Sequence, residues 1–317
     1  MCAAVFDVVK RNLLYLTKTI FGFIIITVRN TLNFTEIYIE DKRMKRIATI
    51  QDFSCVGKCS LTVALPIISA SGIECCGIPT AVLSNHTGFP SFYSHDLTED
   101  IPRICGQLSA HKISFDAIST GYIAGISQIS LIEEFIREFR SESTLVFIDP
   151  VMGDYGRLYS QITERYAEKM RGLCAHADII SPNLTEAYML LGKTYRDDPD
   201  SVELRDMLKE LSELGAKTVV ITGILRGGDI GCAAFDGNDF CEVYGERQDV
   251  FCSGTGDIFA SVLLSAILRG KGFEKALEIA VGFTAEAARF TAADPDRPFY
   301  GVNFEQAIPY LIKLLES

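Results

Sequence analysis

The chain has 317 residues, of which 48% are hydrophobic, and its formal net charge is −11. A chain of this length can bury a large core, and α/β proteins of this size often form a single domain. The acidic balance argues against a nucleic-acid backbone or an anionic membrane as a partner of the main body. A small anionic substrate stays compatible with it, because backbone amides and a metal ion can offset the charge at one site.

The first 43 residues differ from the rest, because they carry a net charge of +2 and the remaining chain carries −13. The apolar stretch Ile20–Val28 is too short to span a bilayer, which needs about 20 apolar residues. No small-residue cleavage site of a signal peptide follows it cleanly. We expect residues 1–43 to be a poorly structured extension or a misassigned start, and residues 44–317 to form the functional domain.

The ten cysteines do not form a metal-binding pattern. The closest pairs are Cys55/Cys59 and Cys75/Cys76, no Cys-x-x-Cys occurs, and no histidine stands at zinc-ligand spacing from the first pair. The cysteine pattern therefore predicts reduced, mostly buried thiols in a cytoplasmic enzyme.

From residue 46 onward, short β-rich runs alternate with helical patterns. Expected strands are Ile47–Gln51, Ala81–Ser84, Ala117–Thr120, Leu145–Asp149, Ile179–Ser181 and Thr218–Thr222. Expected helices are Ser60–Ala70, Ser127–Phe139, Thr163–Leu173, Leu184–Leu191, Val202–Leu214, Thr255–Leu268, Glu274–Thr291 and Phe304–Leu315. Gly231–Phe235 and Phe240–Tyr244, joined through Asp236–Asp239, read as a small antiparallel hairpin.

This alternation, with apolar strands such as Thr218–Thr222, predicts a single doubly wound α/β domain with a mainly parallel sheet and helices on both faces. Ligands of such sheets bind beyond the carboxyl ends of the strands. Polar residues follow six of the expected strands: Asp52, Asn85–Gly88, Gly121 and Tyr122, Asp149 and Asp154, Asn183 and Glu186, Thr222 and Gly223. We expect them to gather at one edge of the sheet.

The most informative segment is Gly254-Thr255-Gly256-Asp257, which opens an apolar helical run. Two glycines allow a tight turn, and the amides of Gly254, Thr255 and Gly256 at a helix start can bind a phosphate or another anion. The carboxylate of Asp257 is placed to accept a proton from a nucleophile that attacks this anion. Ordinary turn chemistry, with an acidic residue favoured by the helix dipole, is the alternative explanation.

Two further segments carry hard oxygen ligands. Asp149 and Asp154 lie five residues apart on an expected turn, and Asn183 and Glu186 lie on one face of an opening helix. Such groups suit Mg²⁺, which is usually shared with substrate phosphates. For Asn183 and Glu186, a helix-capping pair is the alternative explanation.

Three other features carry weaker functional signals: the segment Val56–Ser60, the aromatic residues Tyr122 and Phe53, and His86. Val56–Ser60 resembles a phosphate-binding P-loop, but Asp52 stands where a glycine is needed and Cys59 where Ser or Thr is needed. Tyr122 and Phe53 could stack on an aromatic ring, although aromatic residues near strand ends are often core residues. For His86, in the loop after the second strand, a structural role is the safer interpretation.

Five stretches taken together, in this order and spacing, resemble the ribokinase-type superfamily and, within it, the pyridoxal (vitamin B6) kinases. They are Ser84–Gly88, Thr120–Tyr122, Asp149–Asp154, Ser181–Glu186 and Gly254–Asp257. The resemblance covers about residues 44–317. It implies transfer of the γ-phosphoryl group of Mg·ATP to the hydroxymethyl group of pyridoxal, pyridoxine or pyridoxamine. It also implies a monovalent cation such as K⁺, and a homodimer.

The resemblance also implies a role for each matching residue. Asp257 would be the base, and the amides of Gly254, Thr255 and Gly256 would form the anion hole. The residues implied to organise Mg²⁺ and the phosphates are Asp149, Asp154 and Glu186. Those implied to line the ATP site are Ser181, Asn183, Thr222 and Gly223. Those implied to contact the pyridine-ring substrate are Asp52, Thr87 and Tyr122.

One departure from the resemblance affects the expected substrate. Many pyridoxal kinases have Ser where this chain has Asp52, and an acidic residue there could pair with a protonated ring nitrogen or an amine. The related hydroxymethylpyrimidine kinases of thiamine salvage carry an acidic residue in that region. They usually have Cys, however, where this chain has Asp257. We therefore expect a vitamin B6 kinase, with a pyrimidine kinase or a non-catalytic binding protein as the alternatives.

Overall fold

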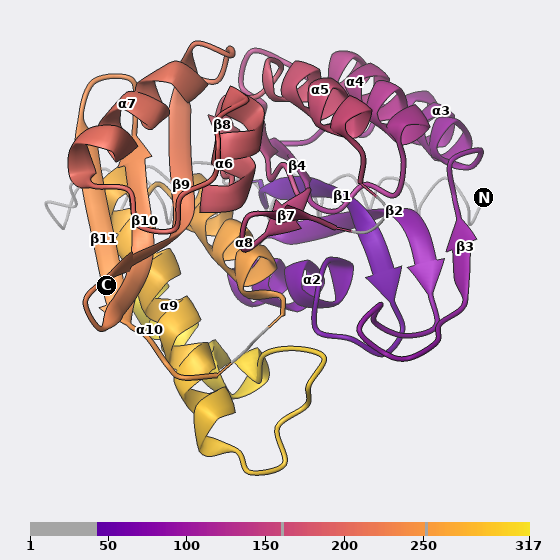
Figure 1. The fold of residues 1–317 in the computed structure, drawn as a ribbon. Coiled ribbons are helices and arrows are strands. Elements are labelled where there is room, and N and C mark those ends of the chain that lie inside the picture. Colours follow the sequence, from indigo (N-terminus) through magenta and orange to yellow (C-terminus); the bar gives the residue numbers. More distant parts are fainter. Residues whose placement is uncertain (1–42, 160–161, 251–252) are drawn as a thin grey trace, which may run out of the picture. The chain divides into compact units, whose positions relative to one another are not determined.

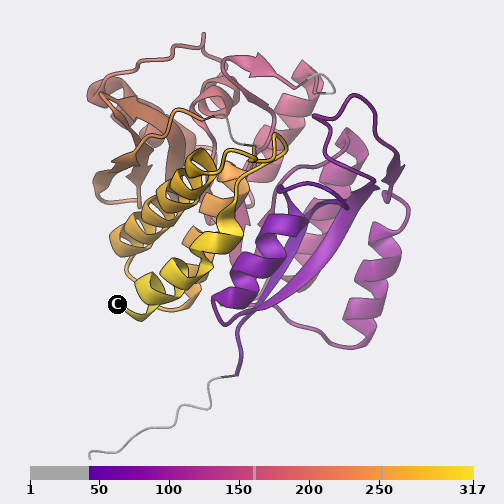
Figure 2. The same cartoon turned by 90° about the horizontal axis from the view of Figure 1, so that it is seen from below.

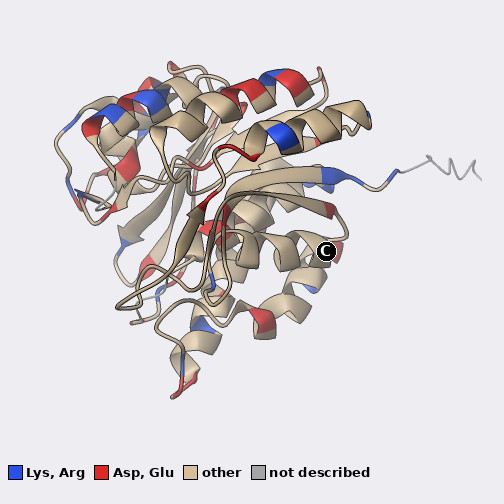
Figure 3. Ribbon diagram, turned by 90° about the vertical axis from the view of Figure 1, so that its right-hand side faces the viewer, with Lys and Arg blue, Asp and Glu red and all other residues tan. Residues whose placement is uncertain are grey.

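The computed structural model describes residues 43–159, 162–250 and 253–317. Our expectation for the N-terminal extension falls almost entirely outside these residues and stays a prediction. Within the described part of the chain, no helix is both long and apolar enough to cross a membrane. Acidic and basic residues are interspersed along the outer helices (Figure 3).

The centre of the domain is a nine-stranded sheet with the order β11-β10-β9-β8-β5-β4-β1-β2-β3. The strands that pair in parallel are β1 (Arg46–Ser54), β2 (Glu74–Leu83), β4 (Ala117–Thr120), β5 (Leu145–Ile148), β8 (Ile179–Ile180) and β9 (Thr218–Arg226). Antiparallel strands complete both edges: β3 (Ser94–Asp96), β10 (Asp229–Phe235) and β11 (Phe240–Glu246). This arrangement confirms the mainly parallel sheet and the hairpin expected near residues 230–245.

Helices cover both faces of the sheet (Figure 1). One face is covered by α3 (Ile101–Ala110), α4 (Ile126–Phe139), α5 (Glu164–Cys174), α6 (Leu184–Leu191) and α7 (Ser201–Ser212). The other is covered by α2 (Leu61–Ala70), α8 (Thr255–Leu268), α9 (Phe273–Ala293), the short 3₁₀ helix η1 (Phe304–Ala307) and α10 (Ile308–Glu316). The doubly wound architecture is therefore confirmed.

Alternate residues of the strands belong to two separate hydrophobic cores, one on each face of the sheet. In β5, Val146 and Ile148 join the core beneath α4–α7, whereas Phe147 joins the core beneath α2, α8 and α9. Because successive side chains of a strand point to opposite faces, a strand covered on both sides must be apolar throughout. This requirement explains the continuous apolar runs in the sequence.

Several elements differ from the expected ones. Strand β1 extends to Ser54 and β9 to Arg226, so Asp52, Thr222 and Gly223 lie within strands instead of following them. Strand β2 begins at Glu74, well before the expected start at Ala81. Pro79 has no partner in β3, which pairs only with Ala81–Leu83. The sequence analysis missed α3, β3 and the short hairpin of β6 (Gly153–Asp154) and β7 (Arg157–Leu158).

The strand order reverses between β1 and β4, because β1 leads to β2 on one side and β4 lies on the other. At such a switch point, the connections leave the carboxyl edge in opposite directions and open a crevice between them. The end of β1 carries Asp52, and β4 is followed by Gly121 and Tyr122. The fold thus places these expected site residues on either side of the crevice.

Truncation of Phe147 tests the two-core arrangement. This ring is fully buried on the α2/α8/α9 face, and we expect Phe147→Ala to lower the free energy of unfolding by about 3–5 kcal/mol, measured by urea denaturation. Val202→Ala, on an exposed side chain of α7, is the control and should change stability by less than about 0.5 kcal/mol. Equal effects of the two substitutions would contradict the described core.

Candidate active site

The Gly254–Asp257 turn forms the start of α8, as the sequence predicted. Gly254 is the N-cap residue with a φ of 84° in the left-handed region, and a Cβ built on it would lie 2.1 Å from the carbonyl oxygen of Lys58. Only glycine fits both the backbone angle and this close approach. The following amides belong to the first helical turn and have no carbonyl acceptor within the helix, so they can bind an anion.

Asp257 lies in the first turn of α8, and its carboxylate accepts a hydrogen bond of 2.9 Å from the backbone N–H of Ser60. Burial raises the pKa of Asp257 to about 7, the Ser60 donor opposes this rise, and the carboxylate of Asp52 adds to it. A carboxyl group with a pKa near neutrality can exchange a proton with an alcohol substrate at physiological pH. This is the behaviour that a general base requires.

A second pair of carboxyl groups lies buried nearby. Asp149 is 8% exposed and Glu186 2% exposed. Burial, the charge of Glu186 and the charge of Asp257 raise the pKa of Asp149 well above its usual range. A Cβ built on Gly256 would lie 3.9 Å from Asp149 Oδ2, so this carboxyl faces the glycine turn. Asp149 and Asp257 therefore lie at one site, as expected.

Glu186 holds two segments together. Its Oε2 accepts from the Asn183 N–H at 2.9 Å, Asn183 Oδ1 accepts from the Glu186 N–H at 3.0 Å, and Oε1 accepts from the Met152 N–H at 2.9 Å. The first two bonds form a capping box, so the capping explanation of this pair is confirmed. Burial raises the pKa of Glu186 to about 8, and the backbone donors oppose the rise. Both oxygens already have backbone partners, so a metal contact through water suits Glu186 better than direct ligation.

Asp154 is not buried as Asp149 and Glu186 are, but it lies close enough for its charge to raise the pKa of Glu186. It is exposed in the β6–β7 hairpin, whose turn residues Tyr155 and Gly156 have φ of 49° and 74°. The hairpin is fixed to the start of α6, because Asn183 Nδ2 donates to the Gly153 carbonyl at 2.8 Å and Thr185 Oγ1 accepts from the Gly156 N–H at 2.9 Å. The described residues contain no group of three or more His, Cys, Asp or Glu side chains arranged to bind a metal ion. The Mg²⁺ role of Asp149, Asp154 and Glu186 thus stays a prediction.

The residues predicted to line the ATP site come from neighbouring strands. Ser181 is buried directly after β8, and Asn183 pairs with Thr222 of β9 through an isolated bridge. Gly223, also in β9, is exposed and has a φ of 75°. The structure brings Asn183 and Thr222 together, but both functional groups of the Asn183 amide already bond protein atoms. Nucleotide binding by these residues stays a prediction.

The predicted substrate residues lie around the end of β1. Asp52 is 5% exposed, and burial raises its pKa, whereas hydrogen bonds from the Ser60 and Ser54 hydroxyls oppose the rise. Burial raises the pKa of Tyr122, and the charge of Asp52 raises it further, so the Tyr122 hydroxyl lies within reach of this charge. Thr87 is exposed in the loop after β2, and its neighbour His86 lies close enough to feel the charge of Asp52.

Several residues at the site were not predicted. Ser60 donates to Asp257 from a strained backbone position that no sequence pattern reveals. Tyr159 lies close enough to the charges of Glu186, Asp154, Asp149 and Asp257 for each to raise its pKa. Thr120, at the end of β4, has a buried hydroxyl oxygen without a hydrogen-bond partner in the described structure. Only Thr120 had a sequence signal, as part of the quoted Thr120–Tyr122 stretch.

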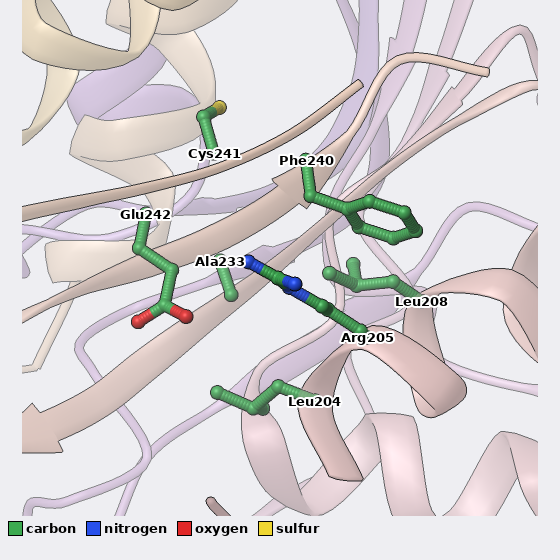
Figure 4. A pocket seen from close by; sticks show the side chains of 7 residues that line it. All are labelled: Leu204, Arg205, Leu208, Ala233, Phe240, Cys241 and Glu242. Atoms are coloured by element: carbon green, nitrogen blue, oxygen red, sulfur yellow. The ribbon is translucent and has the colours of Figure 1, made fainter. Parts of the chain in front are cut away.

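A cavity of about 180 Å³ lies elsewhere, between α7 and the strands β10 and β11 (Figure 4). Its lining comprises Leu204, Arg205, Leu208, Ala233, Phe240, Cys241 and Glu242. Phe240 is covered by two cations, Arg205 at 5.8 Å and Lys209 at 5.4 Å from the ring centroid. None of the predicted site residues lines this cavity.

The doubly wound sheet and the carboxylate beside a glycine turn at a helix start define this chain as a kinase of the ribokinase-like class. It belongs to the phosphomethylpyrimidine kinase family, whose sequence model matches residues 65–301. The expected superfamily and the resemblance to vitamin B6 kinases are thereby confirmed.

Individual relatives support the same assignment. A Bacteroides thetaiotaomicron protein with a provisional assignment as phosphomethylpyrimidine kinase, whose crystal structure was determined with pyridoxal, is 36% identical; the match covers 85% of this chain and 96% of that one, with a TM-score of 0.82. Pyridoxal kinase from Lactobacillus plantarum is 29% identical over 86% of this chain and 99% of its own, with a TM-score of 0.80. Pyridoxal kinase of Arabidopsis thaliana is 29% identical over 80% of this chain and 85% of its own.

The close approach at Gly254 can be tested against a matched glycine. Gly254→Ala and Gly270→Ala both place a side chain at φ near 80°, but only the former meets a neighbouring atom within 4 Å. We expect Gly270→Ala to cost about 1–2 kcal/mol of unfolding free energy and Gly254→Ala clearly more, with loss of catalytic activity. Urea denaturation and a kinase assay measure both effects. Indistinguishable variants would disprove the close contact with Lys58.

Proposed function

We propose that this protein phosphorylates the hydroxymethyl group of a vitamin B6 vitamer with ATP as the phosphoryl donor. The observation that carries the proposal is the arrangement at the start of α8, where the Asp257 carboxyl and the first-turn amides belong to the same turn. The 36% identical relative whose structure was determined with pyridoxal supports a pyridine-ring substrate.

Each half of the site has a task in this reaction. Asp257 accepts the proton of the substrate hydroxyl, and the amides of the Gly254–Gly256 turn bind the transferring phosphoryl group. Asp52 and Tyr122 hold the ring at the end of β1, where the raised pKa of Asp52 lets it share a proton with the ring nitrogen. Catalysis then depends mainly on positioning and on charge stabilisation, because phosphoryl transfer asks little covalent chemistry of the protein.

The buried acidic groups suit a cation that arrives with the nucleotide. Asp149 and Glu186 lie close enough for their charges to interact, and their pKa values are raised by burial. Asp149 would hold Mg²⁺, with Glu186 and Asp154 acting through water, and the ion would neutralise the charge of the phosphates. A monovalent cation, a homodimer and a cytoplasmic location remain part of this proposal as predictions.

A second candidate function is phosphorylation of a hydroxymethylpyrimidine, which the description of the matching family favours. Purified protein should be incubated with Mg·ATP and, separately, with pyridoxal, pyridoxine, pyridoxamine and hydroxymethylpyrimidine. We expect kcat/KM to be highest for a B6 vitamer. A higher value for the pyrimidine would replace the proposed substrate, and binding of a vitamer without turnover would favour a non-catalytic binding protein.

Replacement of the proposed base tests the mechanism. We expect Asp257→Asn to retain ATP affinity and to lose about 10²–10⁴ in kcat, because the amide cannot accept the proton. The wild-type kcat/KM should rise with pH through about 7, since the base acts only when it is ionised. Below a pH of about 7, the residual activity of Asp257→Asn should depend little on pH. Asp239→Asn, on an exposed loop residue, is the control and should behave as wild type.

A further inference from the structure

Lys58 lies in the loop between β1 and α2 and is held at both its side chain and its backbone. Its Nζ donates to Asn303 Oδ1 at 2.9 Å and forms an ion pair with Glu305 Oε2 at 2.8 Å. The ammonium also lies 5.9 Å from the centroid of the Phe304 ring. The Lys58 side chain is 19% exposed and that of Glu305 is 52% exposed, so the ammonium end of the pair is the shielded one.

The backbone of Lys58 is enclosed by glycines from two distant segments. Its N–H donates to the Tyr300 carbonyl at 3.2 Å, and it forms an isolated parallel bridge with Gly301. A Cβ on Gly301 would lie 2.3 Å from Lys58 Cβ, and one on Gly254 would lie 2.1 Å from the Lys58 carbonyl oxygen. The segment after α9 and the turn at the start of α8 therefore both lie against this residue. Figure 2 shows the C-terminal helices (yellow) beside α2 (purple).

Two residues further along the chain, Ser60 has an unfavourable backbone conformation. Its φ of 51° and ψ of −131° are rare for a residue other than glycine. Such conformations cost about 1–3 kcal/mol and persist only where the surroundings impose them. In this conformation the Ser60 N–H points at the Asp257 carboxylate, 2.9 Å away. Local bonds also restrain this turn, since the Ser60 carbonyl accepts from the Val63 and Ala64 amides. The contacts of Lys58 are the restraints beside Ser60 that tie the loop to the C-terminal segment.

We propose that Lys58 is a positioning residue, which anchors the loop 57–60 to the C-terminal segment 300–305 and thereby keeps the strained Ser60 amide directed at Asp257. Lys58 itself does not touch the reacting atoms. The importance of Asp257 for catalysis rests on the function proposed above, but the geometry of the loop does not.

The same C-terminal segment also contacts the substrate side of the site. Phe89, in the loop that contains the predicted substrate residue Thr87, packs on Phe299 at 4.7 Å and on Tyr300 at 5.4 Å between ring centroids. Residues 299–305 thus connect the loop after β2 with the loop after β1. A displacement of residues 299–305 would disturb both loops. A surface contact that only stabilised the fold would not have this effect.

Amide hydrogen exchange tests the positioning directly, without any substrate. In the full-length protein, Lys58→Met should increase the exchange rate of the Ser60 amide by about 10-fold or more, because a weaker anchor lets this hydrogen bond open more often. Lys275→Met is the matched control, since it removes an exposed ion pair of 2.9 Å on α9. Unchanged Ser60 exchange in Lys58→Met would overturn the proposal, whatever the protein phosphorylates.

Kinetics provide the second readout. Lys58→Met should lower kcat by about 10-fold and leave the KM for ATP nearly unchanged, whereas Lys58→Arg, which keeps the charge, should restore most of kcat.

If Lys58→Met does not fold, Glu305→Gln decides, because this partner is half exposed and its loss should raise Ser60 exchange by about threefold. If only Glu305→Gln folds, exchange of its Ser60 amide at the wild-type rate would count against the proposed anchor. If exchange increases but no vitamer is phosphorylated, only the proposed function fails.

Discussion

A cluster of buried carboxyl groups at one edge of the sheet is the feature on which the rest of the structure depends. Asp52, Asp149, Glu186 and Asp257 are all drawn into the interior, and burial is the largest cause of the raised pKa of each. Among the residues that the structure describes, none of the four forms an ion pair with Lys or Arg, and backbone N–H groups are the main donors to Glu186 and Asp257. Burial without a cationic side chain disfavours the charged form of these carboxyl groups, and the Mg²⁺ predicted to enter with the nucleotide would compensate part of their charge.

This arrangement requires unusual backbone geometry around the site. Gly254 and Gly301 let two segments approach Lys58 more closely than any side chain would permit, and Ser60 adopts a left-handed conformation without being glycine. Strain of this kind persists only where neighbouring contacts impose it. Here the contacts join three parts of the chain, namely residues 57–60, the start of α8 and residues 300–305, and Lys58 and Glu305 are 247 residues apart. The turn at the start of α8 is therefore shaped by its contact with a loop that residues 300–305 also hold.

The sequence was sufficient for the elements that local patterns control. The helices Leu184–Leu191 and Thr255–Leu268 begin and end where their periodicity and caps predicted, and the apolar strands follow from burial on both faces. It was insufficient where tertiary contacts override local preference. The sequence analysis predicted only the last part of β2, from Ala81 onward, and nothing in the sequence around Ser60 or Lys58 indicates a contact with Asp257 or Glu305. The capping box of Asn183 and Glu186 was predicted, but its bond to Met152 was not.

In the proposed reaction, phosphoryl transfer and substrate recognition would meet at the pair of Asp52 and Asp257. The start of α8 and the segments tied by Glu186 would face the phosphoryl group, whereas the end of β1 and the loop after β2 would face the ring. The charge of Asp52 is one of the causes that raise the pKa of Asp257. A ring that shares a proton with Asp52 reduces this charge, and so makes Asp257 easier to ionise when the correct substrate is bound. An acidic residue at position 52 thus connects the choice of substrate to the readiness of the base, a connection that a serine at this position would not provide.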